Sequence, residues 1–298
     1  MNRRILLASA AVSGVVLAGM APQVMVAQDA TPEATPAVLA PPQDLLTPNT
    51  LEAEGQTADI NGVSIFYKVY GAGNGNPIIL LHGGLSNGDH FSGIIPALVD
   101  AGHEVITMDS RGHGHSSFDD AQISYEQMAR DVLGLMDHLE IDKADIVGWS
   151  DGGIIGLEIA LTAPERLNKV VAYGANYDPT GVRLDVGTND YFNAYIERAS
   201  EEYQQNSPAP EKWDAFLANI GTMWATQPTY TDEQLTTITT PFLILDGAKE
   251  EAIDLNQTKL MALLIPDAEL VIMPDTGHFA LFEQPEEFTK IVLDYLDS

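Results

Sequence analysis

The chain has 298 residues, 45% of them hydrophobic, and this content excludes a wholly disordered protein. Its 43 acidic side chains outnumber 14 Lys and Arg, and the formal charge of −29 argues against nucleic acid or an anionic membrane surface as a partner, because both would repel it. Without cysteine the chain has no disulfide, no thiolate nucleophile and no Cys-ligated metal, so any nucleophilic side chain must attack through oxygen.

Residues 1–27 have the three-part layout of a secretory signal peptide. Arg3 and Arg4 precede an uncharged run over residues 5–21, and a small residue ends the segment. We expect export with cleavage, by the Tat route that an Arg pair favours or by the Sec route, because Asn2 stands where a Tat signal usually has Ser or Thr. The run also reaches the lower length limit of a membrane span, so an uncleaved N-terminal anchor is the alternative. A cleaved chain would have no stable membrane partner.

Residues 28–50 repeat Thr-Pro and Ala-Pro steps without an apolar period, which predicts an extended tether outside the fold. Regular patterns begin near Thr57 and continue to the end of the chain. We therefore expect residues 51–298 to form the folded domain.

Short apolar runs recur along this domain and predict eight strands. The first two form an antiparallel pair around an Asn61-Gly62 turn, and the other six are apolar on both faces, as buried parallel strands are. Helical patterns lie between them, the clearest of which starts at a Ser124/Gln127 capping box. This alternation predicts an α/β fold with a doubly wound, mostly parallel eight-stranded sheet and flanking helices. The predicted strands are Thr57–Ile60, Val63–Val69, Ile78–Leu81, Val105–Met108, Asp145–Val147, Val170–Tyr173, Phe242–Leu245 and Leu270–Met273.

The alternation stops between about residues 176 and 231. This interval has no strand-like run and holds two helical pieces, near Asp190–Glu202 and Glu211–Trp224, that are rich in aromatic residues. We expect it to form a small helical cap inserted into the domain. A capping box at Thr231/Gln234 then starts the helix that returns the chain to the sheet.

The sequence Gly148-Trp149-Ser150-Asp151-Gly152 lies between an apolar strand and a helical pattern. Such a strand-turn-helix junction holds the serine in a strained conformation, and only glycine fits at the two flanking positions. The Ser150 hydroxyl is then exposed above the sheet edge as a candidate nucleophile. The N-terminal N–H groups of the following helix point to where the negative charge of an acyl-transfer intermediate develops.

A serine nucleophile needs a base, and the base needs an orienting acid. His278 follows the last predicted strand, at the carboxyl edge where open sheets hold their sites, and is the predicted base. His113 and His115 are spaced in a way that also suggests a metal, but no acidic or second His cluster accompanies them at ligand spacing. We therefore expect no metal site.

Three carboxylates compete for the role of the acid after the predicted strand that ends at Leu245: Asp246, Glu250 and Glu251. Asp246 belongs to the strand end and is well placed to cap the turn at Gly247. Glu250 lies beyond that glycine in a loop that can reach a histidine, so it is the predicted acid, with Glu251 next.

A second oxyanion donor is expected from the glycine-rich turn Leu81-His82-Gly83-Gly84-Leu85. We choose the N–H of Gly84, together with the N–H of Asp151. The glycines also permit a tight turn whatever their chemical role.

Together these motifs resemble the α/β-hydrolase family, from about residue 57 to the end. The matching parts are the His82-Gly83-Gly84 turn, Asp109 to Ser116, the Ser150 turn, Asp246 to Glu250, and Gly277-His278, in the family's order of serine, acid and histidine. The Ser150 turn looks most like the biphenyl-hydrolase-like and small carboxylesterase or lactonase members. These members usually have Asp where this chain has Glu250. Serine at position 150 argues against the haloalkane dehalogenases and epoxide hydrolases, which use a carboxylate nucleophile.

The resemblance implies a secreted serine hydrolase that cleaves a small carboxylic ester or lactone through an acyl-enzyme on Ser150, without a metal or organic cofactor. Carbon–carbon bond hydrolysis and cofactor-free perhydrolysis share the same triad and stay open. A non-catalytic secreted binding protein of the same fold is the alternative from another class, and its mark would be a broken triad. Expected substrate contacts are Asp151, Leu85, Trp213, Trp224 and Phe279. The charge of Asp151 either only stabilises the N-terminus of the helix that follows Ser150, or also favours a cationic acyl group.

Overall fold

The computed structural model describes residues 24–25 and 51–298. The signal peptide predicted for residues 1–27 and the tether predicted for residues 28–50 lie outside the described residues, apart from Val24 and Met25. Within the described ranges, no helix combines the length and apolar character that a membrane span requires.

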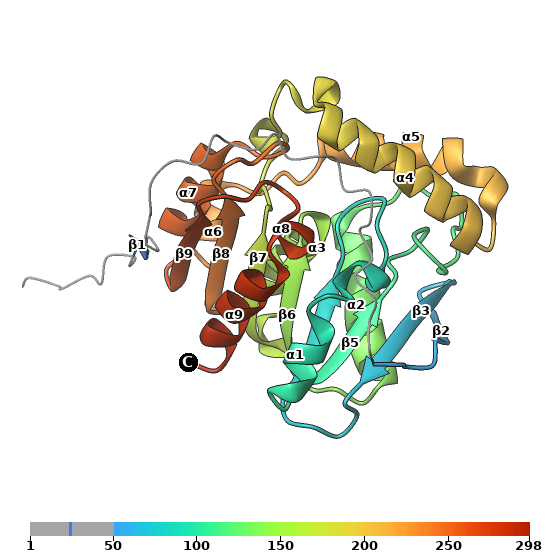
Figure 1. The fold of residues 1–298 in the computed structure, drawn as a ribbon, viewed down its shortest axis with the longest axis horizontal. Helices are drawn as coiled ribbons and strands as arrows, with labels where there is room; N and C mark the ends of the chain where they lie inside the picture. The colour runs from blue at the N-terminus through green and yellow to red at the C-terminus, as the bar shows by residue number, and fades with distance from the viewer. Residues whose placement is uncertain (1–23, 26–50) are drawn as a thin grey trace, which may run out of the picture.

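One sheet runs through the described domain, in the order β1-β9-β8-β7-β6-β4-β5-β3-β2 (Figure 1). All eight predicted strands are present, with ends within three residues of the prediction, and the two residues of β1 add a short parallel partner to β9. The strands are β1 (Val24–Met25), β2 (Gln56–Ile60), β3 (Val63–Tyr70), β4 (Pro77–Leu81), β5 (Glu104–Met108), β6 (Ala144–Trp149), β7 (Leu167–Tyr173), β8 (Phe242–Gly247) and β9 (Ala268–Met273).

The strand directions place the carboxyl ends of the buried strands at one edge. β2 and β3 form the expected antiparallel hairpin, and Asn61 and Gly62 turn it with positive φ angles of 48° and 85°. β3 is also antiparallel to β5, whereas the pairs from β5 through β4, β6, β7 and β8 to β9 are all parallel. Loops that follow β4, β6, β8 and β9 therefore meet at one edge.

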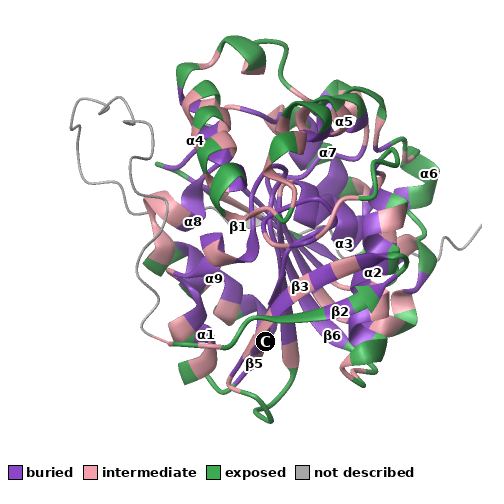
Figure 2. Ribbon diagram, turned by 90° about the vertical axis from the view of Figure 1, so that its right-hand side faces the viewer, coloured by how far each residue is buried: buried purple, intermediate pink, exposed green. Residues whose placement is uncertain are grey.

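Helices cover both faces of the sheet (Figure 2). On one face lie α1 and α9, and on the other lie α2, α3 and α7. The strands between them are buried on both sides; in β4, Ile78 to Leu81 have no exposed surface. The helices are α1 (Ile95–Asp100), α2 (Tyr125–His138), α3 (Asp151–Thr162), α6 (Asp232–Leu235), α7 (Leu255–Leu264), α8 (Ala280–Glu283) and α9 (Pro285–Leu296).

The two predicted capping boxes differ in how fully they form. At α6 the Thr231 hydroxyl accepts from the Gln234 amide N–H while the Gln234 side chain accepts from the Thr231 N–H, so the box is complete. At α2 the Ser124 hydroxyl accepts from the Gln127 N–H at 3.2 Å, but the Gln127 side-chain oxygen is buried without a partner. Ser124 is thus an N-cap alone.

The segment between β7 and β8 contains no strand. It holds α4 (Asp190–Asn206) and α5 (Trp213–Thr226), called the cap helices below, which lie above the carboxyl ends of the strands (Figure 1). α4 runs four residues past its predicted end, and a short 3₁₀ turn over Pro210–Lys212 occupies the predicted start of α5.

Candidate functional site

Ser150 forms the turn between β6 and α3. Its backbone has φ 53° and ψ −116°, a conformation that non-glycine residues rarely adopt, and its N–H is held by the Tyr173 carbonyl oxygen at 2.7 Å. A Cβ on Gly148 would lie 2.3 Å from the Gly152 carbonyl carbon, and one on Gly152 would lie 1.9 Å from the Leu81 oxygen. Both flanking positions therefore require glycine, as the sequence predicts. Ser150 itself is half-buried between two fully buried neighbours.

His278 lies in the loop after β9 and is buried. Its carbonyl oxygen accepts from the Trp149 indole N–H at 2.9 Å, which ties the histidine loop to the residue that precedes Ser150. Its Nδ1 lies 2.8 Å from Oε1 of Glu250. The structure thus brings an imidazole and a carboxylate together at the sheet edge that carries Ser150, and the assignment of base and acid stays a prediction.

The three competing carboxylates occupy different places around His278. Glu250 faces the imidazole, and the same Oε1 accepts from the N–H groups of Ala252 and Ile253 at 2.6 and 2.9 Å. Glu251 accepts from the backbone N–H of His278 at 2.7 Å. The Asp246 oxygens accept from the Gly247 N–H at 2.8 Å and from the Thr258 hydroxyl at 2.6 Å.

Burial sets the charges of this cluster. It raises the pKa of Glu250 to about 7, against hydrogen bonds that lower it. It raises the pKa of Asp246 well above the ordinary value, and the neighbouring charge of Glu250 raises it further. Burial lowers the pKa of His278, which the charges of Asp246 and Glu251 oppose. Burial and the Glu250 charge thus disfavour the ionised form of Asp246 more than that of Glu250.

The histidine loop has supports that the sequence analysis missed. Glu283 of α8 accepts from the Gly277 N–H at 2.8 Å, next to the Glu251 bond to His278. The Tyr173 hydroxyl of β7 donates to the Gly277 carbonyl oxygen and accepts from the Ala280 N–H at 3.0 Å. No local motif marks Glu283 or Tyr173, because their roles arise only when β7, β9 and α8 pack together.

The glycine turn after β4 lies against the Ser150 turn. A Cβ on Gly83 would sit 3.3 Å from the Ser150 Cβ, and one on Gly84 would sit 2.5 Å from Oδ2 of Asp151. Within the described part of the chain, no acceptor takes the N–H of Gly84 or of Asp151. Two free backbone donors beside a serine can bind an oxyanion.

Asp151 is itself buried, and two side chains donate hydrogen bonds to its carboxylate. Its carboxylate accepts from the Tyr125 hydroxyl at 2.8 Å and from the Trp224 indole N–H at 3.0 Å. Burial raises the pKa of Asp151 to about 6, although both hydrogen bonds lower it. Asp151 and Trp224, both predicted to contact substrate, thus bond to each other between α3 and α5.

The other predicted substrate contacts lie in the packing under the cap helices. Leu85 is buried with φ 65°. Phe279 is fully buried, with its ring 5.7 Å from that of Trp149, and Trp213 packs on Tyr203 at 5.3 Å between the cap helices. Substrate contact by these residues stays a prediction.

Two further histidines, His82 and His113, contact backbone groups of the loop that follows β5. The Nε2 of His82 accepts from the Ser110 N–H at 2.9 Å, and Nδ1 of His113 lies 3.0 Å from the Arg111 carbonyl oxygen. Burial lowers the pKa of His82 to about 4 and the pKa of His113 to about 3, so both are neutral. Among the residues described, no three His, Asp or Glu side chains are grouped to hold a metal.

Comparisons with known proteins agree with this geometry. The family model of the alpha/beta hydrolase fold matches residues 76–200. A 2-hydroxy-6-oxo-6-phenylhexa-2,4-dienoate hydrolase of Burkholderia cepacia is 30% identical over 266 residues, which cover 76% of this chain and 89% of that protein. This chain belongs to the α/β hydrolase family.

Other members of the family are similar over most of this hydrolase. The human serine hydrolase BPHL is 28% identical over 251 residues, 80% of this chain and 84% of that protein. A meta-cleavage product hydrolase from Pseudomonas fluorescens superimposes with a TM-score of 0.70 at 25% identity and covers 82% of this chain and 97% of its own. The enol-lactonase from Burkholderia xenovorans, at 24% identity and a TM-score of 0.66 over 82% and 100% of the two chains, shows the same fold. The chain is accordingly a hydrolase that acts on small molecules.

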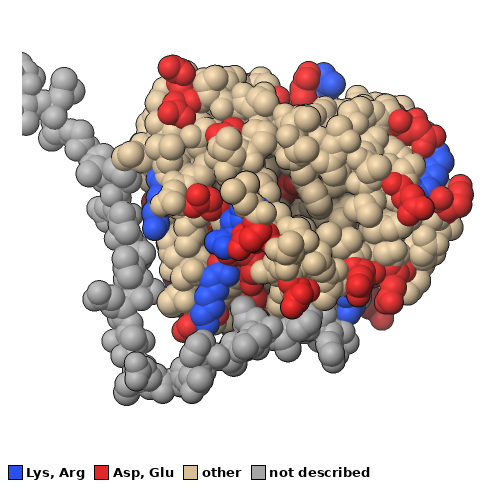
Figure 3. Space-filling model, turned by 90° about the horizontal axis from the view of Figure 1, so that it is seen from above, with Lys and Arg blue, Asp and Glu red and all other residues tan. Residues whose placement is uncertain are grey.

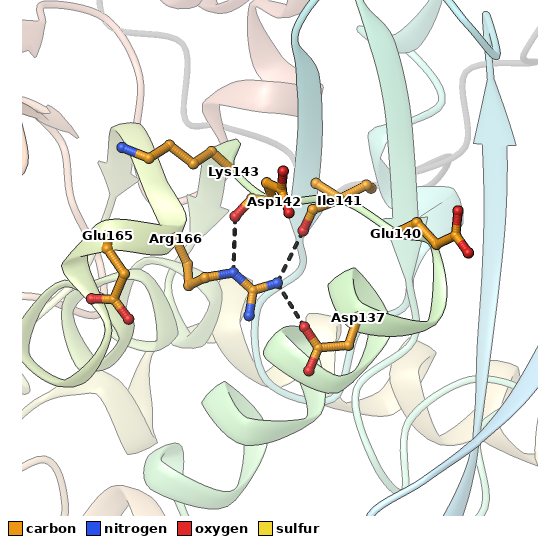
Figure 4. A pocket seen from close by; sticks show the side chains of 7 residues that line it. All are labelled: Asp137, Glu140, Ile141, Asp142, Lys143, Glu165 and Arg166. Carbon is orange, nitrogen blue, oxygen red and sulfur yellow. Dashed lines mark hydrogen bonds and ion pairs between the residues drawn. The ribbon is translucent and has the colours of Figure 1, made fainter.

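A surface depression of the hydrolase lies at the opposite edge of the sheet, near the start of β6 (Figure 4). Its one arginine, Arg166, binds the Asp137 carboxylate at 2.8 Å and donates to the carbonyl oxygens of Ile141 and Asp142, each at 2.9 Å. These contacts tie α2 to the loop that precedes β6. The depression is lined by Asp137, Glu140, Ile141, Asp142, Lys143, Glu165 and Arg166.

Proposed function

We propose that this α/β hydrolase is a serine hydrolase that cleaves a small carboxylic ester or lactone through an acyl-enzyme on Ser150. The observation that carries the proposal is the strained, half-buried Ser150 at the sheet edge where the His278 imidazole lies 2.8 Å from the Glu250 carboxylate. Backbone strain at such a turn persists only where surrounding structure enforces it, and it clusters at catalytic sites.

The proposed reaction assigns a role to each residue of the site. His278 takes the Ser150 proton as the hydroxyl oxygen attacks the carbonyl carbon, and Glu250 stabilises the imidazolium that forms. The N–H groups of Gly84 and Asp151 bind the oxyanion of the tetrahedral intermediate. The imidazolium then protonates the leaving alkoxide, and the ester bond breaks. Water, activated by the same histidine, releases the acid and restores the serine.

The charge around the site favours a neutral or cationic substrate over an anionic dienoate. The carboxylates of Glu250 and Glu251 contact His278, and the residue next to Ser150, Asp151, carries a further carboxylate. Figure 3 shows the molecule from above the cap helices, with acidic side chains spread over this face, a few basic ones among them, and red acidic atoms visible in the hollow near its middle. Carbon–carbon bond hydrolysis remains the second candidate, since relatives named as dienoate hydrolases are 29 and 30% identical to this chain.

A fluorophosphonate probe tests the proposal. It should label the wild type covalently and leave Ser150→Ala unlabelled, because the probe reacts with an activated serine. A panel of p-nitrophenyl esters, lactones and a dienoate then separates the substrate classes by kcat/KM. Equal labelling of both proteins would reject Ser150 as the nucleophile, and a wild type that neither labels nor hydrolyses would favour a binding protein.

Export is part of the proposal. Replacement of Arg3 and Arg4 by Lys should abolish export by the Tat route, whose receptor reads the Arg pair, and should leave Sec export intact. Fractionation of cells that express each form measures the outcome. Retention of both forms in the membrane fraction would indicate the N-terminal anchor instead.

A further inference from the structure

A buried polar chain joins cap helix α4 to the loop that follows β4. Glu202 of α4 places Oε2 2.8 Å from Nε2 of His90 and accepts from the Asn87 side-chain amide at 3.3 Å. On the other side of the imidazole, Nδ1 lies 2.5 Å from the Ser86 hydroxyl. Ser86 and His90 are 1% and 2% exposed, so water does not compete for these contacts.

The charge of Glu202 fixes the direction of the hydrogen bonds. Burial opposes ionisation, but the bonds from His90 and Arg198 outweigh it and lower the pKa of Glu202. A carboxylate only accepts, so Nε2 of His90 carries the proton that faces it. The Nδ1 atom on the other side of the ring contacts the Ser86 hydroxyl, so the chain runs from Ser86 through His90 to Glu202.

A second contact from the same helix holds the same loop. The hydroxyl of Tyr195, two turns before Glu202 on α4, donates to the Gly84 carbonyl oxygen at 2.6 Å. Leu85, between the two contact points, has a positive φ of 65°. A strained loop residue keeps its conformation only when its surroundings hold it.

Little free space remains between the loop and the helix. The cavity between them, lined by Leu85, Ser86 and Glu202 among others, measures about 10 Å³, which is the space of about one water molecule. The loop and α4 are therefore closely packed as well as hydrogen-bonded. A shift of α4 therefore moves the loop that follows β4, and a shift of that loop moves α4.

We propose that Glu202, His90 and Tyr195 are positioning residues, through which cap helix α4 sets the place of the Gly84 N–H in the oxyanion hole. The inference rests on the proposed serine hydrolase function. The cap thereby acts on the chemical step, and not only on the shape of the substrate pocket. An oxyanion donor that is misplaced by about 1 Å loses much of its effect in the transition state while substrate binding is spared.

Glu202→Ala and Tyr195→Phe remove the two contacts separately. We expect each to lower kcat for p-nitrophenyl acetate by about ten- to a hundredfold with little change in KM. Affinity for a trifluoromethyl ketone, which forms a tetrahedral adduct, should fall by a similar factor, whereas affinity for the matching methyl ketone should not change. Glu202→Gln keeps an acceptor for His90 and should restore most of kcat.

Glu201→Ala is the matched control, because Glu201 is exposed one position earlier on α4 and carries the same charge. Thermal melts confirm that each variant is folded at the assay temperature. The positioning role is wrong if both variants match Glu201→Ala in kcat and in adduct affinity, or if the loss lies in KM alone. Failure of the proposed function shows itself separately, since the wild type would then form no Ser150 adduct, and the positioning role would fall with it.

Discussion

Asp246 lies at the end of β8 and Glu250 in the loop that follows it, and the two carboxyl groups are expected to differ in charge. Glu250 contacts the His278 imidazole, whereas Asp246 caps a turn and burial raises its pKa well above the ordinary value, which favours its protonated form. Glu250→Gln should lower kcat by about 10⁴-fold, as loss of an orienting carboxylate does elsewhere. Asp246→Asn should change kcat little, because an amide resembles a protonated acid. Steady-state kinetics on p-nitrophenyl acetate measure both, and the reverse order of losses would give the role to Asp246.

Ser150 and His278 should behave as one unit. Ser150→Ala and His278→Ala should each reduce kcat by about 10⁶-fold, and the double mutant should be no worse than either, because the histidine has no task without the hydroxyl. Circular dichroism checks that the fold is intact. Near wild-type activity in His278→Ala would contradict the assignment.

Individual residues were predictable where one chain segment dictates their geometry. Gly148 is required by a 2.3 Å contact within the Ser150 turn; Gly152 is required by a 1.9 Å contact with Leu81 of β4, but the local motif marks it as well. His90, Glu202 and Glu283 escaped the sequence analysis because their partners lie on other elements: Glu202 meets His90 across 112 positions. Such pairs follow from the packing of α4 and α8, which a single sequence does not display.

At the scale of elements, Asp151 joins three helices, since it starts α3 and bonds Tyr125 of α2 and Trp224 of α5. Its pKa rises from 3.8 to about 6 on folding, so the folded state retains a proton that the unfolded state releases. This stabilises the fold below pH 3.8, and the contribution is lost as pH rises through 6.

Asp151→Asn should remove this pH dependence. Relative to wild type, the variant's free energy of unfolding should increase by about 2 kcal/mol between pH 4 and pH 7. Urea unfolding at both pH values gives the difference, in which the titration of all other groups cancels. If the difference in free energy of unfolding between variant and wild type is the same at both pH values, folding does not raise the pKa of Asp151.

Element types were easier to predict than element ends. Six of the eight predicted strands are visible without tertiary information because buried parallel strands are apolar on both faces, and the Asn61-Gly62 turn marks the antiparallel pair β2 and β3. The end of α4 at Asn206 was missed because its last turn is polar and has no apolar period that would indicate a helix. Ser124 looked like half of a capping box, but packing leaves the Gln127 side chain unbonded.

For the whole molecule, the order of motifs was enough to predict the doubly wound sheet and the cap between β7 and β8, because each parallel strand needs a crossover on one face. The two-residue β1 was not predictable, since Val24 and Met25 lie in a stretch with the composition of a signal peptide. Their pairing with β9 depends on a sheet edge that the local sequence does not reveal.

The charge of −29 predicts how the whole molecule responds to salt. Exposed ion pairs such as Arg130–Glu126 and Lys290–Asp294 involve few of the 43 acidic residues, so net repulsion should dominate the surface. Raising NaCl from 10 to 200 mM shortens the Debye length from about 30 Å to less than 10 Å. The Tm should therefore rise, by about 2–4 °C for each kcal/mol of repulsion that is screened.

A charge-reduced variant separates screening from other effects of salt. Glu140→Gln, Glu233→Gln and Glu286→Gln together remove three exposed charges outside the candidate site. The triple variant should have a higher Tm than wild type at 10 mM NaCl and a smaller rise at 200 mM, because less repulsion remains to be screened. KCl should act like NaCl, since screening depends on ionic strength alone. A Tm that falls with salt in both proteins would mean that attractive pairs outweigh the repulsion among the acidic side chains.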